Sequence, residues 1–87
     1  MAESGGLVTM GKKAMSELAE LIGCPAEGIT GIHKNSDGWV VTVEVLEVER
    51  VPETTDVLAS YEVEVDADGD VVGYRRLRRY LRAQVDD

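Results

Sequence analysis

The stretch VLASYEVEVDADGDVVGYRRLRRYLR, residues 57–82, decides the fold class of this chain. From Val57 to Val65, apolar or aromatic residues occupy the odd positions, while Ser60 and two glutamates occupy even ones. This alternation is the period of a strand with one buried face. The turn sequence DADG follows at residues 66–69 and places a glycine where a hairpin needs a positive φ. The pattern predicts an antiparallel hairpin whose second arm begins at Asp70.

The second arm of this hairpin, residues 70–82, is compatible with two structures. As a helix, it would align Tyr74, Leu77 and Leu81 on one side. As a strand, it would turn Val71 and the two leucines toward the core. Its outer face would then carry two tyrosines and two arginines: Tyr74, Arg76, Arg78 and Tyr80. We predict a strand, because a tight glycine turn after a long strand requires a pairing arm.

Upstream of the hairpin, residues 39–49 form the clearest strand pattern of the chain. One face would consist of Trp39 and three valines at positions 41, 43 and 45, opposite Thr42 and Glu44. The alternation slips after Val45, which predicts a β-bulge near residues 45–46. Residues 28–34 are a weaker strand candidate, and an uncovered edge there would allow weak pairing between two copies of the chain.

The amino-terminal part predicts one amphipathic helix that begins at Thr9 and stops at Gly23. Its apolar stripe has helical spacing and consists of Ala14, Leu18, Leu21 and Ile22. The predicted fold is therefore α+β, with an N-terminal helix packed on a four-stranded antiparallel β-meander. Residues 1–8 are expected to be a flexible amino terminus, residues 9–83 a single domain and residues 84–87 an acidic tail.

Composition limits the classes of function. The chain has 87 residues, a net charge of −8 and one cysteine. One domain is expected at this length, and no internal disulfide can form. We expect a soluble cytoplasmic protein, because no stretch resembles a signal peptide or could span a bilayer. His33 and Cys24 are the sole members of their types, and no pattern around them indicates catalysis. The chain is therefore predicted not to be an enzyme.

The charges are strongly segregated, since five of the nine basic residues lie in the last arm, between Tyr74 and Arg82. On the outer face of the meander they would lie beside the acidic residues Glu44, Glu62 and Glu64. This arrangement has two interpretations: a self-neutralising ladder on a solvated surface, or a binding face with a positive stripe beside a negative one. The candidate partner-binding residues are Tyr74, Arg75, Arg76, Arg78, Arg79 and Tyr80.

Two further kinds of binding receive less support from the sequence. Arginines interleaved with tyrosines could hold single-stranded nucleic acid, but the acidic total and the nearby carboxylates would repel phosphate. Nucleic acid is therefore an unlikely partner. The run from Asp66 to Asp70 resembles the start of a calcium loop, but its glycine stands fourth instead of sixth. We predict a hairpin turn there, with no metal site and no cofactor.

The run GWVVTVEVLEVERVPETTDVLASYEVEVDADGDVVGYRRLRRYLR, residues 38–82, resembles the gas vesicle protein O family. The matching pieces keep one order along the chain: Gly38-Trp39, Glu47 with Arg50 and Pro52, residues 56–59, residues 61–63, residues 66–69 and residues 74–80. The resemblance implies a non-catalytic accessory or minor component in the formation of gas vesicles, associated with the vesicle in the cytoplasm. It also implies other gas vesicle proteins, shell or accessory, as partners. The alternative is a regulator of gas vesicle genes that acts on nucleic acid through the arginine-rich strand.

Overall fold

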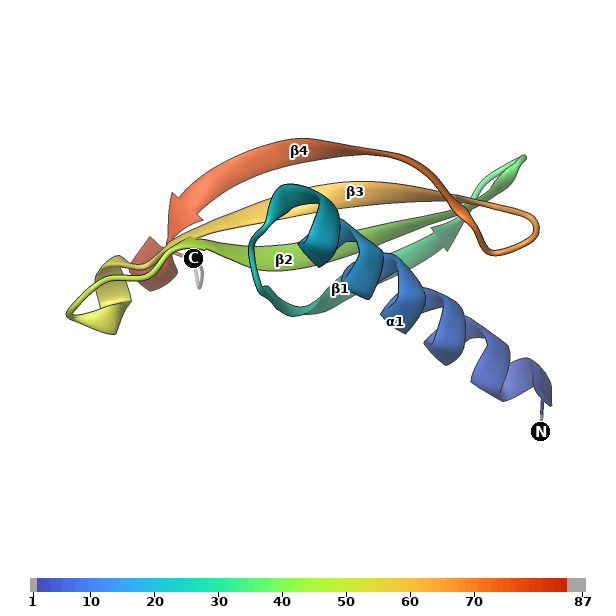
Figure 1. The fold of residues 1–87 in the computed structure, drawn as a ribbon, viewed down its shortest axis with the longest axis horizontal. Coiled ribbons are helices and arrows are strands. Elements are labelled where there is room, and N and C mark those ends of the chain that lie inside the picture. Colours follow the sequence, from blue (N-terminus) through green and yellow to red (C-terminus); the bar gives the residue numbers. More distant parts are fainter. Residues whose placement is uncertain (1, 85–87) are drawn as a thin grey trace.

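The computed structural model describes residues 2–84 and shows one helix lying across one face of a curved four-stranded sheet (Figure 1). The strands are antiparallel neighbours in the order β1-β2-β3-β4, which is a meander. The predicted fold is therefore confirmed. The elements are α1 (Ala2–Ile22), β1 (Ala26–Lys34), β2 (Gly38–Val48), β3 (Val57–Asp66) and β4 (Val71–Leu81), with short 3-10 turns at Glu53–Thr55 and Arg82–Gln84.

The core lies between α1 and the concave face of the sheet. Val41 pairs with Val63, and Val43 with Tyr61, so the two predicted apolar faces meet side by side. From the helix, Leu18 is fully buried against them. A branched Cβ suits a pleated surface, and each buried valine stabilises the fold by about 1.5 kcal/mol or more. The predicted faces of β2 and β3 are confirmed.

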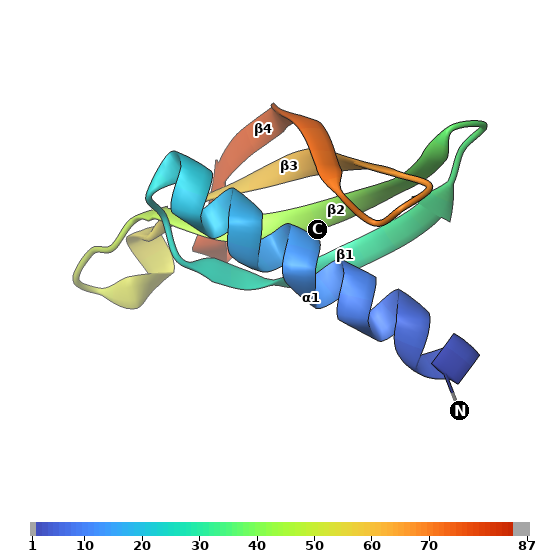
Figure 2. The same cartoon turned by 45° about the vertical axis from the view of Figure 1, so that its right-hand side comes forward.

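The helix differs from its prediction at its start and in its stripe. It begins at Ala2 instead of Thr9, so the capping role expected for Thr9 is wrong. Its amino-terminal turns extend beyond the sheet (Figures 1 and 2), which explains why Leu7 there is exposed. Leu21 is also exposed, because the helix turns this side chain away from the sheet. The predicted stop is confirmed: Gly23 has a φ of 73° and donates its N–H to the carbonyl of Ala19 at 2.9 Å.

Three register shifts interrupt the ladders between β2, β3 and β4. In β2 the extra residue is Glu47, because Leu46 pairs with Leu58 while Val48 pairs with Val57. The predicted bulge is therefore real, but it lies beyond the predicted position. In β4 the extra residues are Val72 and Leu77, which no alternation in the sequence indicated. Each bulge reverses the face to which the following side chains point.

The predicted hairpin turn at residues 66–69 is confirmed. Gly69 has a φ of 89°, and the carboxylate of Asp66 accepts N–H bonds from Asp68 and Asp70, both at 3.0 Å. At the start of β2, beside this turn, Gly38 packs directly against the backbone of Val65. Between residues 2 and 84, no group of three or more His, Cys, Asp or Glu side chains could hold a metal ion. In the same part of the chain, no helix has the length and apolar character needed to cross a membrane.

Candidate functional site

The arginine-rich arm is a strand, and it lies at the edge of the sheet. Residues Val71–Leu81 pair along their length with β3, so the helical alternative for this arm is wrong. Because β4 is last in the strand order, its other edge has no neighbouring strand in the described part of the chain. We call residues 74–80 of this strand the arginine ribbon. It contains the six candidate partner-binding residues: Tyr74, Arg75, Arg76, Arg78, Arg79 and Tyr80.

The bulge at Leu77 divides the six candidates between the two faces of the sheet. Residues that pair across a ladder share a face, so the partners on β3 give each orientation. Three candidates pair with residues outside the core cluster packed against α1, namely Glu62, Ser60 and the buried Leu58, and lie on the outer face: Arg75, Arg78 and Tyr80. The other three pair with the core-facing residues Val63, Tyr61 and Ala59 and lie on the helix side: Tyr74, Arg76 and Arg79.

This division corrects part of the predicted face. Arg78 and Tyr80 lie outward as predicted, but Tyr74 and Arg76 do not. Leu77, predicted to face the core, is the extra residue of a bulge and is exposed. Leu81 pairs with Val57 on the predicted side but is exposed at the end of the strand, and Val71 packs against the core as predicted. The physical reason is the pair of extra residues in β4, since each one shifts the alternation by one position.

The outer face is a mixed charged surface. Arg75 lies beside Glu62, with its Nη2 3.2 Å from a carboxylate oxygen. Tyr80 donates its hydroxyl hydrogen to Glu44, and the guanidinium of Arg78 stacks over the Tyr80 ring at 4.6 Å. Among the residues described, Arg78 makes no ion pair. Burial raises the pKa of Tyr80, and the hydrogen bond to Glu44 raises it further.

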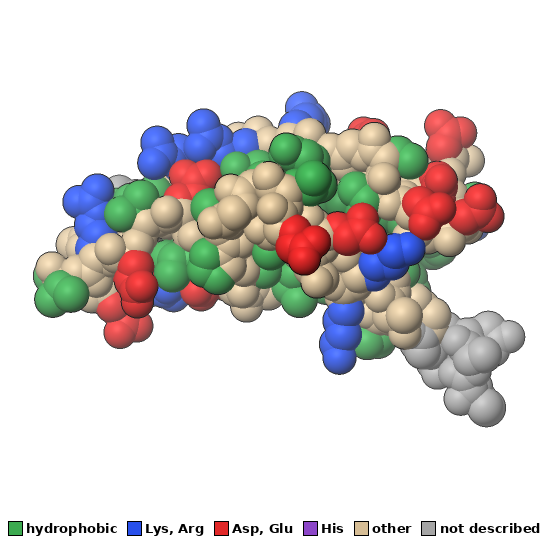
Figure 3. All heavy atoms as spheres, viewed as in Figure 1, with side chains coloured by type: hydrophobic (Ala, Val, Ile, Leu, Met, Phe, Trp, Pro, Cys, Tyr) green, Lys and Arg blue, Asp and Glu red, His purple; other side chains and the backbone are tan. Residues whose placement is uncertain are grey.

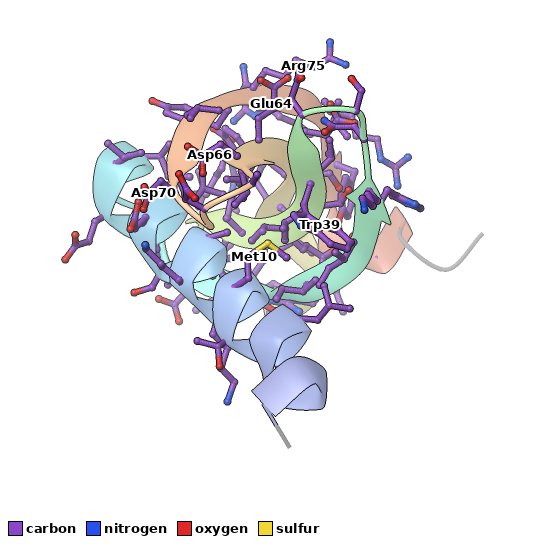
Figure 4. All side chains as sticks on the ribbon, turned by 90° about the vertical axis from the view of Figure 1, so that its right-hand side faces the viewer. Met10, Trp39, Glu64, Asp66, Asp70 and Arg75 are labelled. Carbon is purple, nitrogen blue, oxygen red and sulfur yellow. The ribbon has the colours of Figure 1, made fainter. Side chains whose placement is uncertain are left out.

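Glu64, the third predicted acidic residue, projects from the same side of the sheet as Arg75, away from the helix (Figure 4). A small open pocket lies between them, lined by Glu62, Glu64, Gly73, Tyr74 and Arg75. Two of the three predicted acidic residues, Glu62 and Glu44, therefore contact the ribbon directly, while Glu64 lies beside it.

On the helix side, the ribbon converges on a glutamate that sequence reasoning did not select. The carboxylate of Glu47 accepts from Nε of Arg79 at 2.8 Å and from Nη1 of Arg76 at 3.1 Å. It also accepts from the hydroxyl of Tyr61 at 3.3 Å. Burial raises the pKa of Tyr61, and the nearby Glu47 carboxylate adds to the rise. The side chain of Glu47 is only 12% exposed, so it is a partly buried clamp for two arginines.

A signal for Glu47 was present in the sequence. It stands where the alternation of β2 slips, and a bulge commonly re-aims a side chain. A charged residue at such a slip has a different direction from its neighbours, and here that direction leads to the ribbon.

The last arginine of the arm, Arg82, belongs to a separate structural contact. Its Nη2 lies 3.1 Å from Asp56, and its Nη1 lies 3.3 Å from Glu27. Asp56 is buried and also accepts the backbone N–H of Arg50 at 2.7 Å. Arg82 therefore fastens the end of β4 to the loop before β3 and to β1.

The arginines of the ribbon remain accessible although most of them have partners. Side chains of Arg75, Arg76 and Arg79 are 72%, 46% and 51% exposed. In the space-filling view, basic side chains gather along the upper left rim, where β4 ends, while acidic side chains gather at the right end and also lie below the basic ones (Figure 3). Tyr74 and Leu77, each 44% exposed, add apolar surface between the charges.

Fold and site together define a small α+β domain whose edge strand presents arginines on both faces. Residues 1–86 match the family described as gas vesicle synthesis protein GvpO. The chain belongs to the gas vesicle protein O family, and the resemblance noted in its sequence is confirmed. The description of this family names gas vesicle synthesis and no catalysed reaction.

Similar proteins come from bacteria and archaea. Gas vesicle protein O of Streptomyces sp. (strain CB03234) is 53% identical over 73 residues, which cover 84% of this chain and 57% of the relative. Gas vesicle protein O of Haloferax mediterranei is 40% identical over 81 residues, 92% of this chain and 58% of the relative. Gas vesicle protein O1 of Halobacterium salinarum is 37% identical over 73 residues, 84% of this chain and 61% of the relative. The chain thus matches about three fifths of the length of these relatives. No solved structure matches it.

Proposed function

We propose that this chain is a non-catalytic accessory or minor component in gas vesicle formation, and that it binds another gas vesicle protein, shell or accessory, through the arginine ribbon. Membership of a family described as gas vesicle synthesis proteins supports the process. One observation supports the surface: the ribbon arginines stay about half exposed or more even where they have carboxylate partners.

The internal ion pairs of the ribbon do not prevent an external partner from binding. Exposed ion pairs contribute roughly 0–1 kcal/mol, so a carboxylate of another protein can replace or join an internal one at little cost. Arginine is suited to this because its planar guanidinium offers several donors at once. The exposed ring of Tyr74 adds the kind of aromatic contact that anchors interfaces.

The acidic residues around the ribbon would set the orientation of the complex. Glu44 and Glu62 hold side chains of the outer face in place, and Glu64 keeps a negative charge beside Arg75. A partner must therefore match a positive stripe with a negative border. Such complementarity contributes more to selectivity and encounter rate than to affinity. We place this binding in the cytoplasm, at the growing vesicle.

Co-purification with the other products of a gas vesicle gene cluster tests the proposal. The variant is Arg75→Glu/Arg78→Glu, because Arg78 makes no ion pair among the described residues and Arg75 is the most exposed of the ion-paired arginines. The matched control is Lys12→Glu/Arg50→Glu, which changes the net charge equally at exposed positions outside the ribbon. We expect the first variant to lose its partner and the control to keep it, while both retain the far-UV circular dichroism of the parent.

Three results would contradict the proposal. Normal vesicle formation with the Arg75→Glu/Arg78→Glu variant would remove the ribbon from the function. Equal loss of the partner in the control variant would show that the change in net charge, and not the ribbon, causes the loss of binding. Loss of the folded spectrum in the ribbon variant alone would make the arginines structural. If the ribbon instead binds an oligonucleotide with strong salt dependence, the regulator of gas vesicle genes becomes the better proposal.

A further inference from the structure

We propose that the open edge of β4 binds an extended acidic segment of the partner as a fifth strand of the sheet. This inference rests on the proposed function and deepens it, since it names the binding mode and the chemistry of the partner. In β-strand addition, main-chain hydrogen bonds supply affinity and alternate side chains supply specificity.

The edge is available along the ribbon. β4 is the last strand in the order of the sheet, so its outer row of backbone donors and acceptors faces away from β3. The helix reaches only the beginning of this strand, where Lys13 lies 3.0 Å from the carboxylate of Asp70 and Val71 packs against the core. From Tyr74 onward, most side chains of the strand are exposed.

The charges of the edge select an acidic occupant. An added strand would lie about 4.8 Å from β4, so its side chains would stand directly beside those of the ribbon on both faces. On the outer face they would meet Arg75 and Arg78, and on the helix side Arg76 and Arg79. Carboxylates on the outer face would complement Arg75 and Arg78, while Arg76 and Arg79 on the helix side already share Glu47 and would lie beside the apolar residues of the added strand.

The molecule already contains a strand of this chemistry on the other side of β4. The sequence of β3 alternates valines with Glu62 and Glu64, and Glu62 pairs with Arg75 both in register and through its carboxylate. The predicted occupant would therefore repeat on the open edge the pairing that β3 makes on the closed one.

A second copy of the chain does not fit this edge. Two β4 strands in contact would set arginines against arginines, and like charges directly opposite one another are destabilising. The other open edge, β1, ends in His33 and Lys34 and so offers little negative charge. The net charge of the whole chain is −8, but charges more than about 10 Å from the ribbon are largely screened at 0.1 M salt. They therefore repel an acidic segment bound at the ribbon only weakly.

A peptide experiment on the full chain tests this inference. The probe is a nine-residue peptide of alternating Glu and Val, and the charge control replaces every Glu with Lys. We expect saturable binding of the Glu peptide only, with amide chemical-shift changes and slower hydrogen exchange in β4 residues 74–80. Arg75→Glu/Arg78→Glu should weaken binding about tenfold, because two attractive charge pairs become repulsive. Lys12→Glu/Arg50→Glu should leave it nearly unchanged.

Two N-methylated peptides separate strand addition from simple charge attraction. One carries N-methyl groups at positions 3, 5, 7 and 9 and the other at positions 2, 4, 6 and 8, so that net charge and the number of N-methyl groups stay equal. A strand uses only alternate residues to bond a given neighbour, so one peptide should lose binding and the other should keep it. Equal binding of both peptides, no binding of the Glu/Val peptide, or equal binding of the Lys peptide would overturn the inference. If the peptide fails while the ribbon still retains its vesicle partner, the proposed function stands without strand addition; if both fail, the proposed function falls as well.

Discussion

Replacing Glu47 with glutamine removes the carboxylate that Arg76 and Arg79 share, while the size of the side chain stays the same. The structure predicts a measurable loss of stability. Glu47 is mostly shielded from solvent and accepts bonds of 2.8 Å and 3.1 Å from the two guanidinium groups. A hydrogen bond to a charged group contributes about 1.5–3 kcal/mol where solvent is excluded.

The exposure of the two arginines reduces this value. Both are about half exposed, so water screens the pairs and replaces part of the lost interaction. The bond from the hydroxyl of Tyr61 is long, at 3.3 Å, and adds little. We therefore expect Glu47→Gln to lower the free energy of unfolding by about 1–2 kcal/mol. For a domain of this size, that corresponds to a fall in Tm of roughly 5–15 °C.

Urea unfolding followed by the fluorescence of Trp39 measures the change, because this is the single tryptophan of the chain. The matched control is Glu64→Gln, at an exposed glutamate on the neighbouring strand, which should change stability by less than about 0.5 kcal/mol. A double-mutant cycle with Arg79→Gln should give a coupling energy of at least about 0.5 kcal/mol. The reasoning is refuted if Glu47→Gln costs no more than the control, or if the coupling is zero.

Three further predictions follow from the structure. Gly38→Ala should lower the free energy of unfolding in urea by about 3 kcal/mol, because the added Cβ would overlap the carbonyl oxygen of Val65. The control Gly28→Ala has open space around the added Cβ and should change the free energy of unfolding by less than about 1 kcal/mol. Equal losses in the two variants would contradict this prediction. Burial raises the pKa of Tyr61 and Tyr80 in the folded chain, so unfolded molecules lose the phenolic proton first and stability should fall as the pH rises above about 10. In urea unfolding between about pH 8 and pH 11, the Tyr61→Phe/Tyr80→Phe variant should lose less stability with rising pH than the parent chain. An equal loss in both would refute the assignment of this pH dependence to the two tyrosines. Titration with a single-stranded oligonucleotide at low salt should show no salt-sensitive binding, whereas such binding would assign the ribbon to nucleic acid.

Much of the fold could be predicted because its strongest patterns are local. The alternation along residues 39–45 and 57–65 follows from which side chains need burial, and the meander follows from the short turns between strands. The turn at Gly69 was predictable for the same reason, since only its own backbone decides that a glycine is needed. Helix boundaries are less local, and the first turns of α1 lie beyond the sheet, where no apolar contact marks them.

The candidate site was predictable in its location and wrong in part of its geometry. The segregation of arginines after Gly73 identified the strand that carries the ribbon. It could not identify Glu47, which lies 29 residues before Arg76 and reaches it only because β2 and β4 curve toward one another across β3. The segregation of arginines also could not show that Arg82 lies outside the ribbon, where Asp56 holds it at the far end of the strand.

The amino-acid sequence by itself determined that the chain forms a helix and four strands, which faces of β2 and β3 are buried, and where the positive charge lies. Hydrophobic period and turn chemistry depend only on neighbouring residues, so they can be read directly from the chain. The tertiary structure decided which arginines lie on which face and which carboxylates hold them. A single extra residue at Leu77 or Glu47 reverses the alternation, and whether a strand accepts that residue depends on packing against its neighbours in the sheet.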